Sequence, residues 1–168
     1  MELWDVYDEN RVPMGRTHVR GVPFKEGEYH LIADVWTVNG NGEILLTRRH
    51  PDKPYGLMWE CTGGSVLTGE SSIEGAIREL FEETGITAKQ EELKLIHRIR
   101  LKERFVDTYI TLKDVTLKDM TLQAEEVVDA RFVRFEELLY MWKQGVVVPK
   151  SRFPLYKDRI QEFIDPPS

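Results

Sequence analysis

Residues 64 to 86 read Gly-Ser-Val-Leu-Thr-Gly-Glu-Ser-Ser-Ile-Glu-Gly-Ala-Ile-Arg-Glu-Leu-Phe-Glu-Glu-Thr-Gly-Ile, and this stretch carries the strongest structural signal in the chain. Ser71 and Glu74 have the spacing of a capping box, in which each side chain bonds the backbone of the other residue at a helix start. Apolar residues recur at helical spacing up to Leu80, and Gly85 is the residue type that most often ends a helix. The stretch therefore predicts a helix over residues 71 to 84 with a loop on either side.

Three glutamates crowd one side of this helix. Glu79, Glu82 and Glu83 stand at positions i, i+3 and i+4, so their carboxylates repel one another. A hard divalent cation such as Mg²⁺ or Mn²⁺ removes that repulsion, because it prefers carboxylate oxygens and water as ligands. The alternative interpretation, without any function, is that these three residues form an acidic helix face exposed to solvent. The fixed register of Glu70 and Arg78 with them favours the metal site.

The rest of the chain alternates between strand-like and helix-like patterns. Residues 28 to 38 and 43 to 47 predict two strands, joined as a hairpin by the turn signal Asn39-Gly40-Asn41-Gly42. Further strands are predicted at about 94 to 105, 107 to 117 and 126 to 135, and helices at about 136 to 144 and 155 to 164. This order predicts a mixed sheet covered by helices. No repeat or linker divides the chain, so we expect one domain over residues 1 to 168.

Composition excludes several classes of protein. The chain has 168 residues, and its formal net charge of −6 argues against a general affinity for nucleic acid or an anionic membrane. Cys61 is the only cysteine, which excludes an internal disulfide and a thiolate zinc cluster. No apolar run reaches the length of about 18 residues that spans a bilayer, and the acidic first residues are unlike a signal peptide. We expect a cytoplasmic protein.

The helix and its flanking loops resemble the signature of the Nudix hydrolases. That signature is Gly, five residues, Glu, seven residues, then Arg-Glu-apolar-x-Glu-Glu-x-Gly-apolar. Every specified position is filled here over residues 64 to 86, namely by Gly64, Glu70, Arg78, Glu79, Leu80, Glu82, Glu83, Gly85 and Ile86. The resemblance implies an α+β fold, an α/β/α sandwich around a mixed sheet, with the signature forming a loop-helix-loop.

The resemblance also implies an activity and a set of roles. Members of the family hydrolyse a diphosphate linkage, commonly in a nucleoside diphosphate joined to another group, by attack of a metal-activated water. Glu82 and Glu83 would be the principal Mg²⁺ ligands, with Mn²⁺ as a substitute, and Glu79 would ligate the metal or orient a water. The carbonyl of Gly63 would complete the metal's coordination. Glu70 and Arg78 would hold these groups in place without touching the metal.

A further acid is expected outside the signature, as general base or additional ligand. Glu126, just before the strand-like stretch from Val127 to Phe135, is our candidate, with Glu125 and Asp107 as alternatives. A solvated turn leading into a strand is an equally good interpretation of Glu126.

A diphosphate also needs cationic partners. Arg48 and Arg49 leave the second strand near the glycine loop, and an arginine can bind phosphate oxygens with two parallel hydrogen bonds. We expect the ligand to be a small-molecule diphosphate. Its specific recognition is expected to depend on the loops at residues 50 to 58, 102 to 108 and 140 to 154. Homodimers are frequent in the family, and the sequence leaves both monomer and homodimer open.

The resemblance extends beyond the signature toward one subgroup. Five short segments are similar to the isopentenyl-diphosphate isomerases that share this fold: residues 3 to 10, 17 to 21, 29 to 31, 46 to 49 and 56 to 59. An isopentenyl-diphosphate isomerase is therefore the alternative function.

The residues that the isomerase reaction needs are largely missing. The catalytic cysteine of the isomerases corresponds to Gly63 here, and one of their histidine ligands corresponds to Ser65. Their two other histidine ligands correspond to about Pro23 and to His30, so only His30 is matched. Cys61 lies two residues too early. Isomerisation requires placed acid and base groups, whereas the intact glutamate pattern is that of a hydrolase.

Overall fold

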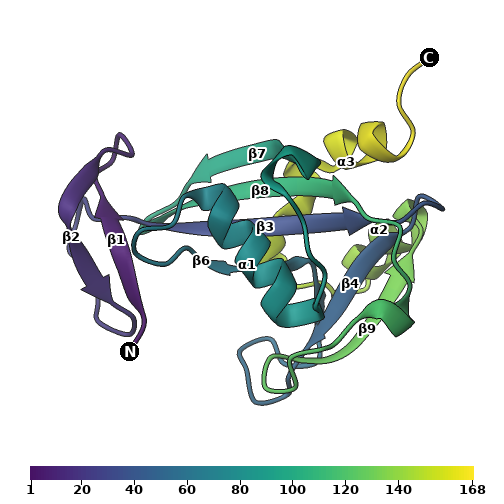
Figure 1. The fold of residues 1–168 in the computed structure, drawn as a ribbon, viewed down its shortest axis with the longest axis horizontal. Coiled ribbons are helices and arrows are strands. Elements are labelled where there is room, and N and C mark those ends of the chain that lie inside the picture. Colours follow the sequence, from purple (N-terminus) through teal and green to yellow (C-terminus); the bar gives the residue numbers. More distant parts are fainter.

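The computed structural model describes all 168 residues and is built around a seven-stranded mixed sheet (Figure 1). Its central path runs β5-β4-β3-β8-β7, while β6 also pairs with β3 and β9 with β4. β3 and β8 are parallel, and the other pairs are antiparallel. The strands are β3 (His30–Val38), β4 (Ile44–Arg49), β5 (Trp59–Glu60), β6 (Thr62–Ser65), β7 (Leu93–Arg100), β8 (Arg104–Leu112) and β9 (Val127–Val133).

Helices cover both faces of this sheet. α1 (Ser72–Thr84) packs Ala76 and Leu80 on one face, together with Leu31 and Ala33 of β3. On the other face α2 (Phe135–Lys143) and α3 (Lys157–Ile164) enclose a second apolar cluster around Trp36. The predicted α/β/α sandwich around a mixed sheet is thus confirmed. None of the three helices combines the length and apolar character needed to cross a membrane.

Short 3-10 turns complete the chain. They span Gln90–Glu92, Leu117–Asp119, Pro149–Ser151 and Phe153–Leu155.

Two details of the predicted sheet are corrected. The turn between the strands predicted at 94 to 105 and 107 to 117 lies earlier, at residues 101 to 103, where Leu101 N–H donates to the carbonyl of Arg104 at 2.7 Å. This turn has no glycine, proline or asparagine to mark it, which explains the error. In the predicted hairpin, β3 and β4 pair only at Val38 and Ile44, because β4 then diverges to pair with β5 and β9.

An amino-terminal hairpin, absent from the sequence prediction, forms a separate two-stranded sheet of β1 (Leu3–Tyr7) and β2 (Pro13–Val19). Figure 1 shows it at one end of the main sheet, beside the start of β3. Trp4 stacks on His30 with ring centroids 4.1 Å apart, and His18 stacks on Phe24 at 3.9 Å. These rings fasten the hairpin to the amino-terminal end of β3.

A buried ion pair adds a second attachment for the hairpin. Arg11, in the turn between β1 and β2, donates from Nη1 to Asp107 of β8 at 2.8 Å. Asp107 also accepts a hydrogen bond from Arg98 at 2.7 Å, and these two arginines hold the pKa of its carboxyl below the usual range despite its burial.

Candidate active site

The signature segment folds as β6, a loop and α1. Ser71 caps the helix: its hydroxyl accepts from Glu74 N–H at 3.2 Å, while the Glu74 carboxylate accepts from Ser71 N–H at 3.1 Å. At the other end Gly85 adopts φ 77° and donates its N–H to Phe81 O at 2.7 Å, a conformation that glycine tolerates best. Gly75 lies so close to Val66 that a Cβ there would be 3.0 Å from its side chain. These contacts fix the rotation of α1 over the sheet.

Arg78 joins the helix to β6 and to the loop between them. Its guanidinium donates to Glu70 at 2.8 Å and to the carbonyl of Ser65 at 2.9 Å. The same group donates to Glu79 and to Glu82, each at 3.1 Å. Arg78 therefore contacts two of the three helix carboxylates. The supporting role that the family resemblance implies for Arg78 and Glu70 stays a prediction.

Glu83 is the most buried of the three helix glutamates, with 8% of its surface exposed. Its carboxylate accepts from Gly63 N–H at 3.1 Å, so helix and glycine strand are joined at this point. Gly63 itself pairs with Asp34 across β3 and β6. A Cβ on Gly63 would lie 2.1 Å from Asp34 Oδ1 and 2.8 Å from Ala33 O, so no side chain fits there without a shift.

The acidic groups around Gly63 destabilise one another's charged forms. Burial raises the pKa of Glu83 well above its ordinary value, and the charges of Glu79 and Glu60 raise it further. Burial also raises the pKa of Glu79, although Arg78 opposes the shift. Burial raises the pKa of Asp34 to about 7, with Glu60 and Glu79 adding to the rise. Elevated carboxylate pKa values in a concave region are typical of sites that bind cations or transfer protons.

The donor set suits a hard divalent cation in its chemistry. Carboxylates of Glu79, Glu82 and Glu83 and the backbone of Gly63 are the oxygen ligands that Mg²⁺ and Mn²⁺ prefer. The three carboxylates are not arranged around one point, however, and no group of three His, Cys, Asp or Glu side chains has the geometry of a metal cage. Two of the three carboxylates, those of Glu79 and Glu82, are instead paired with Arg78.

These residues line an open groove of about 910 Å³, which we call the glutamate groove. Its walls include Gly63, Gly64, Arg78, Glu79, Glu82, Glu83 and Glu126, together with the cations Arg20, Arg49 and Lys53. Most of its lining residues are polar, as expected of a site for a charged ligand. The groove thus brings together the helix glutamates, the glycine loop and the candidate acid from outside the signature.

Glu126 lines the groove, where it forms an ion pair with Lys53. Burial lowers the pKa of Lys53, and so does the neighbouring Arg49. The alternatives named from the sequence lie elsewhere. Glu125 is exposed and does not line the groove, and Asp107 is buried beneath the amino-terminal hairpin between two arginines.

The side chains of the two candidate phosphate-binding residues, Arg48 and Arg49, lie in different places. Arg49 lines the groove, with its Nη1 2.8 Å from a carboxylate oxygen of Glu60. Arg48 points away: its Nε donates to the carbonyl of Leu57 at 2.9 Å, and its guanidinium lies over the ring of Trp59 at 5.5 Å. Arg48 is absent from the groove lining.

Two acids of this site, Asp34 and Glu60, are not among the residues predicted from the sequence. Asp34 stands in the middle of an otherwise apolar strand, Ala33-Asp34-Val35, and Glu60 lies between two buried residues, Trp59 and Cys61. A carboxylate in the interior of a buried strand is itself a signal, because such groups are rarely retained without a role.

The surroundings of Cys61 bear on whether it could act as the catalytic cysteine of an isomerase. The Cys61 thiol is buried, and burial raises the pKa of this thiol well above its ordinary value, so it is not a ready nucleophile or acid. The place of the isomerase cysteine is taken by Gly63, and the space beside it is filled by Asp34.

Comparison with known proteins gives consistent findings. The family model described as "NUDIX domain" matches residues 28–152. An uncharacterised Nudix hydrolase of Listeria monocytogenes is 40% identical over 151 residues, covering 89% of each chain. Among solved structures, the protein DR0079 of Deinococcus radiodurans superposes with a TM-score of 0.72 at 20% identity, covering 88% of this chain and 92% of its own.

Two partial matches bear on the reaction. The 8-oxo-dGTP diphosphatase of Escherichia coli is 38% identical over 74 residues, which cover 44% of this chain and 54% of its own. The isopentenyl-diphosphate Delta-isomerase of Paenarthrobacter aurescens is 31% identical over 98 residues, which cover 57% of this chain and 53% of its own. Both matches are limited to part of each protein.

Proposed function

This chain belongs to the Nudix hydrolase family, and from that premise we propose that it hydrolyses a diphosphate linkage in a nucleoside diphosphate or a related nucleoside-diphosphate compound, with Mg²⁺ as cofactor. The observation that carries the proposal is the groove in which Glu79, Glu82 and Glu83 face the side-chain-free strand at Gly63 and Gly64. A bound divalent cation would supply activation of water and neutralisation of charge on the diphosphate oxygens.

The residues of the chain have distinct roles in this proposal. Glu83 and Glu82 would hold the cation, while Glu79 would ligate it or orient the attacking water. Gly63 lets the backbone approach the ligand closely, because its Cα carries no side chain. Glu126 accepts a proton from the water, and its ion pair with Lys53 keeps the carboxylate at the groove wall.

Arg49 and Lys53 bind the diphosphate from the side opposite the helix. Both are cations of the groove, and an arginine offers two parallel hydrogen bonds to phosphate oxygens. Arg78 binds Glu70, Glu79 and Glu82, and therefore positions the metal ligands instead of contacting substrate.

The test is a product assay with a panel of nucleoside-diphosphate compounds, with and without Mg²⁺, on wild type and on Glu83→Gln. We expect metal-dependent turnover in the wild type and a fall of about 100-fold or more in Glu83→Gln, since this substitution removes a charge that the cation needs. Glu162→Gln, at an exposed position of α3, is the matched control and should behave as wild type. Full activity of Glu83→Gln would refute the ligand assignment.

The isomerase alternative rests on the partial match to the Paenarthrobacter enzyme and on the sequence similarity of the first half of the chain. Isopentenyl diphosphate belongs in the same panel, analysed for migration of the double bond. We expect none, because Gly63 stands where isomerisation requires a thiol, and the Cys61 thiol lies two residues away with a raised pKa. Formation of the dimethylallyl isomer would reverse the choice between the two reactions.

A further inference from the structure

A second, smaller cavity adjoins the glutamate groove on the opposite face of the sheet from α1. Its volume is about 190 Å³, and six of its lining residues also line the groove: Ile32, Arg49, Glu60, Gly63, Gly64 and Lys150. Asp34 lies in it because alternation along β3 puts this residue on the same face as Trp36. The remaining walls come from the ends of β7 and β8 and from the loop at residues 148 to 152.

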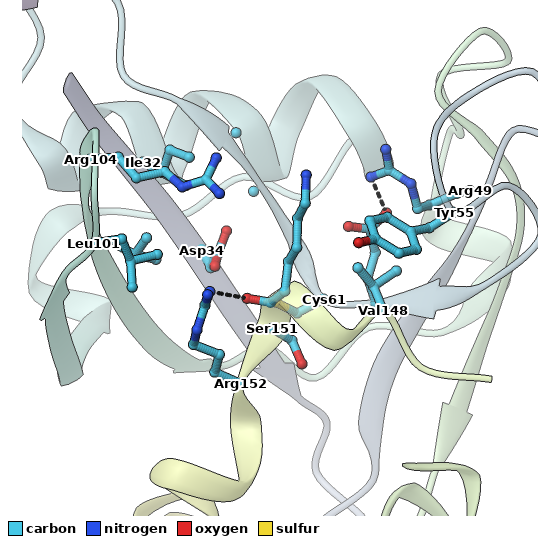
Figure 2. A pocket seen from close by; sticks show the side chains of 15 residues that line it. Ile32, Asp34, Arg49, Tyr55, Cys61, Leu101, Arg104, Val148, Ser151 and Arg152 are labelled. Atoms are coloured by element: carbon cyan, nitrogen blue, oxygen red, sulfur yellow. Dashed lines mark hydrogen bonds and ion pairs between the residues drawn. The ribbon is translucent and has the colours of Figure 1, made fainter. Parts of the chain in front are cut away.

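Cations outnumber acids in this cavity: Arg49, Arg104, Lys150 and Arg152 line it, against Asp34 and Glu60. Arg104, Lys150 and Arg152 all line it, and none of them forms an ion pair, whereas Arg49 is neutralised by Glu60 at 2.8 Å. Figure 2 shows Arg104 and Arg152 reaching into the cavity from two sides, with Asp34 between them. Burial lowers the pKa of Lys150, and the charges of Arg104, Arg49 and Arg152 lower it further, so these cations act on one another. We call this site the cationic cavity.

Two of the residues that line the cavity have unusual backbones. Arg152 has φ 49° and ψ 25°, and Tyr55 has φ 57°, both in the left-handed region that favours glycine. Pro149 and Pro154 stand on either side of Arg152 in a pair of 3-10 turns. The fold thus keeps an arginine where glycine would be less strained, and its only side-chain hydrogen bond is a long one, 3.3 Å, to the carbonyl of Lys150.

We propose that the cationic cavity binds a compact anionic group, a phosphate monoester or a carboxylate, that the substrate carries beyond its diphosphate. This inference rests on the proposed function of the neighbouring groove and names the class of substrate it takes. Arg20 and Lys53 line the groove and not the cavity, whereas Arg104 and Arg152 line the cavity and not the groove, so these two arginines are available for another anion. Lys150 lines both spaces. Gly63 and Gly64 lie on the border of the two spaces and carry no side chains, which leaves room there for one ligand to extend from one space into the other.

The size of the cavity limits the group to a small one. A volume of 190 Å³ corresponds to about six water molecules at roughly 30 Å³ each, which suits a phosphate or carboxylate with the carbons that bear it. It falls below the range of about 300–1,000 Å³ in which whole drug-sized ligands bind, so a complete nucleoside would not fit. Tyr55, which is 41% exposed, also lines the cavity, and the Lys150 ammonium lies over its ring at 5.4 Å from the centroid.

The experiment compares equilibrium binding of compounds that differ only in the added anion. For phosphate the pairs are NADPH with NADH and coenzyme A with dephospho-coenzyme A, and for carboxylate the pair is UDP-glucuronate with UDP-glucose. Dissociation constants are measured by calorimetry with Mg²⁺ on Glu83→Gln, in which turnover is expected to be slowed. We expect at least one charged member to bind 10-fold or more tightly than its partner, and the pair that responds identifies the anion.

Variants assign the effect to the cavity. Arg104→Met and Arg152→Gly, each made in the Glu83→Gln protein, should reduce the preference to less than about twofold. Lys157→Met, an exposed lysine outside both cavities, should retain it. Arg152→Gly should also melt at or above the temperature of its parent, because glycine relieves the left-handed strain. A loss of preference in Arg152→Gly is then not a loss of fold.

The outcomes separate this inference from the proposed reaction. If no charged member binds more tightly than its partner, or if the preference survives in both cavity variants, the inference is wrong, even where wild type hydrolyses the compounds. If wild type hydrolyses nothing but the cavity-dependent preference is observed, the cavity assignment stands and the proposed reaction fails.

Discussion

Substitution of Gly63 by alanine tests the close approach on which the site depends. Gly63 does not need a positive φ, so space is the obstacle to a side chain there. A Cβ would lie 2.1 Å from Asp34 Oδ1, 2.8 Å from Ala33 O and 3.0 Å from Asp34 Cα. The last two are backbone atoms, so relief requires β6 to move away from β3 instead of a simple rotation of one side chain.

The expected magnitude follows from those contacts. Overpacking of a well-packed region typically costs about 1–3 kcal/mol of unfolding free energy. For a chain of this length each kcal/mol lowers the melting temperature by about 2–4 °C, so Gly63→Ala should lower it by roughly 2–12 °C. A shift of β6 also displaces the Gly63 N–H that binds Glu83, and a misplacement of about 1 Å in a catalytic site is worth about 100-fold in rate.

Thermal unfolding and kcat/KM on the best substrate of the panel are the two assays. Gly145→Asn is the control, because a Cβ at Gly145 would have no atom within 4 Å, and asparagine tolerates the φ of 73° at this position. Removal of the carboxylate in the double variant Asp34→Ala, Gly63→Ala should recover only part of the lost stability, since the contact with Ala33 O remains. Wild-type melting and activity in Gly63→Ala would refute the reasoning.

Three further predictions concern charges of the groove. Arg78→Met should lower the unfolding free energy in urea by about 2 kcal/mol and reduce turnover, because it leaves three half-buried or exposed carboxylates without their cation. Since burial raises the pKa values of Glu79 and Glu83, their ionised forms oppose folding at neutral pH, and this opposition is relieved as the pH falls through the raised pKa values. The stabilisation by Mg²⁺ in scanning fluorimetry should therefore be larger at pH 8 than at pH 5. Arg49→Met should reduce kcat/KM by about 10- to 100-fold, whereas Arg48→Met, whose side chain covers Trp59 outside the groove, should stay within about twofold of wild type.

Each of these predictions has a contradicting result. Unchanged urea stability of the Arg78 variant would show that the carboxylates are solvated well enough without it. An equal effect of Mg²⁺ at both pH values would mean that the cation does not compete with protons for Glu79 and Glu83. Similar losses in the Arg48 and Arg49 variants would place both side chains on the path of the substrate.

The parts of the structure that the sequence predicted well are those fixed by neighbours in the chain. The helix at 71 to 84 begins and ends as expected because the capping box at Ser71 and the left-handed Gly85 act within one turn. The grouping of Arg78 with Glu70 follows from the same local register. The turn at residues 101 to 103 was misplaced because pairing with β8 sets it, and no residue there has a strong turn preference of its own.

The site beyond the helix depends on sheet pairing, which periodicity does not reveal. Asp34 lies next to Gly63 because of the register in which β6 pairs with β3. The side chains of Arg48 and Arg49 point to opposite sides of the sheet, because successive residues of a strand face opposite sides. The expectation that loops at 50 to 58, 102 to 108 and 140 to 154 read the substrate stays a prediction. The cationic cavity takes Tyr55, Arg104 and Arg152 from these loops or their borders.

The amino-terminal hairpin bears on where this protein can be shortened. The family match begins at residue 28, yet Trp4 of the hairpin stacks on His30, and Arg11 is one of the two arginines that neutralise the buried Asp107. A chain shortened to the matched residues would expose the ring of His30 at the beginning of β3. It would also leave the buried Asp107 carboxylate with one arginine instead of two. The unit that folds is thus larger than the unit that sequence families delimit, and boundaries for expression belong ahead of the hairpin.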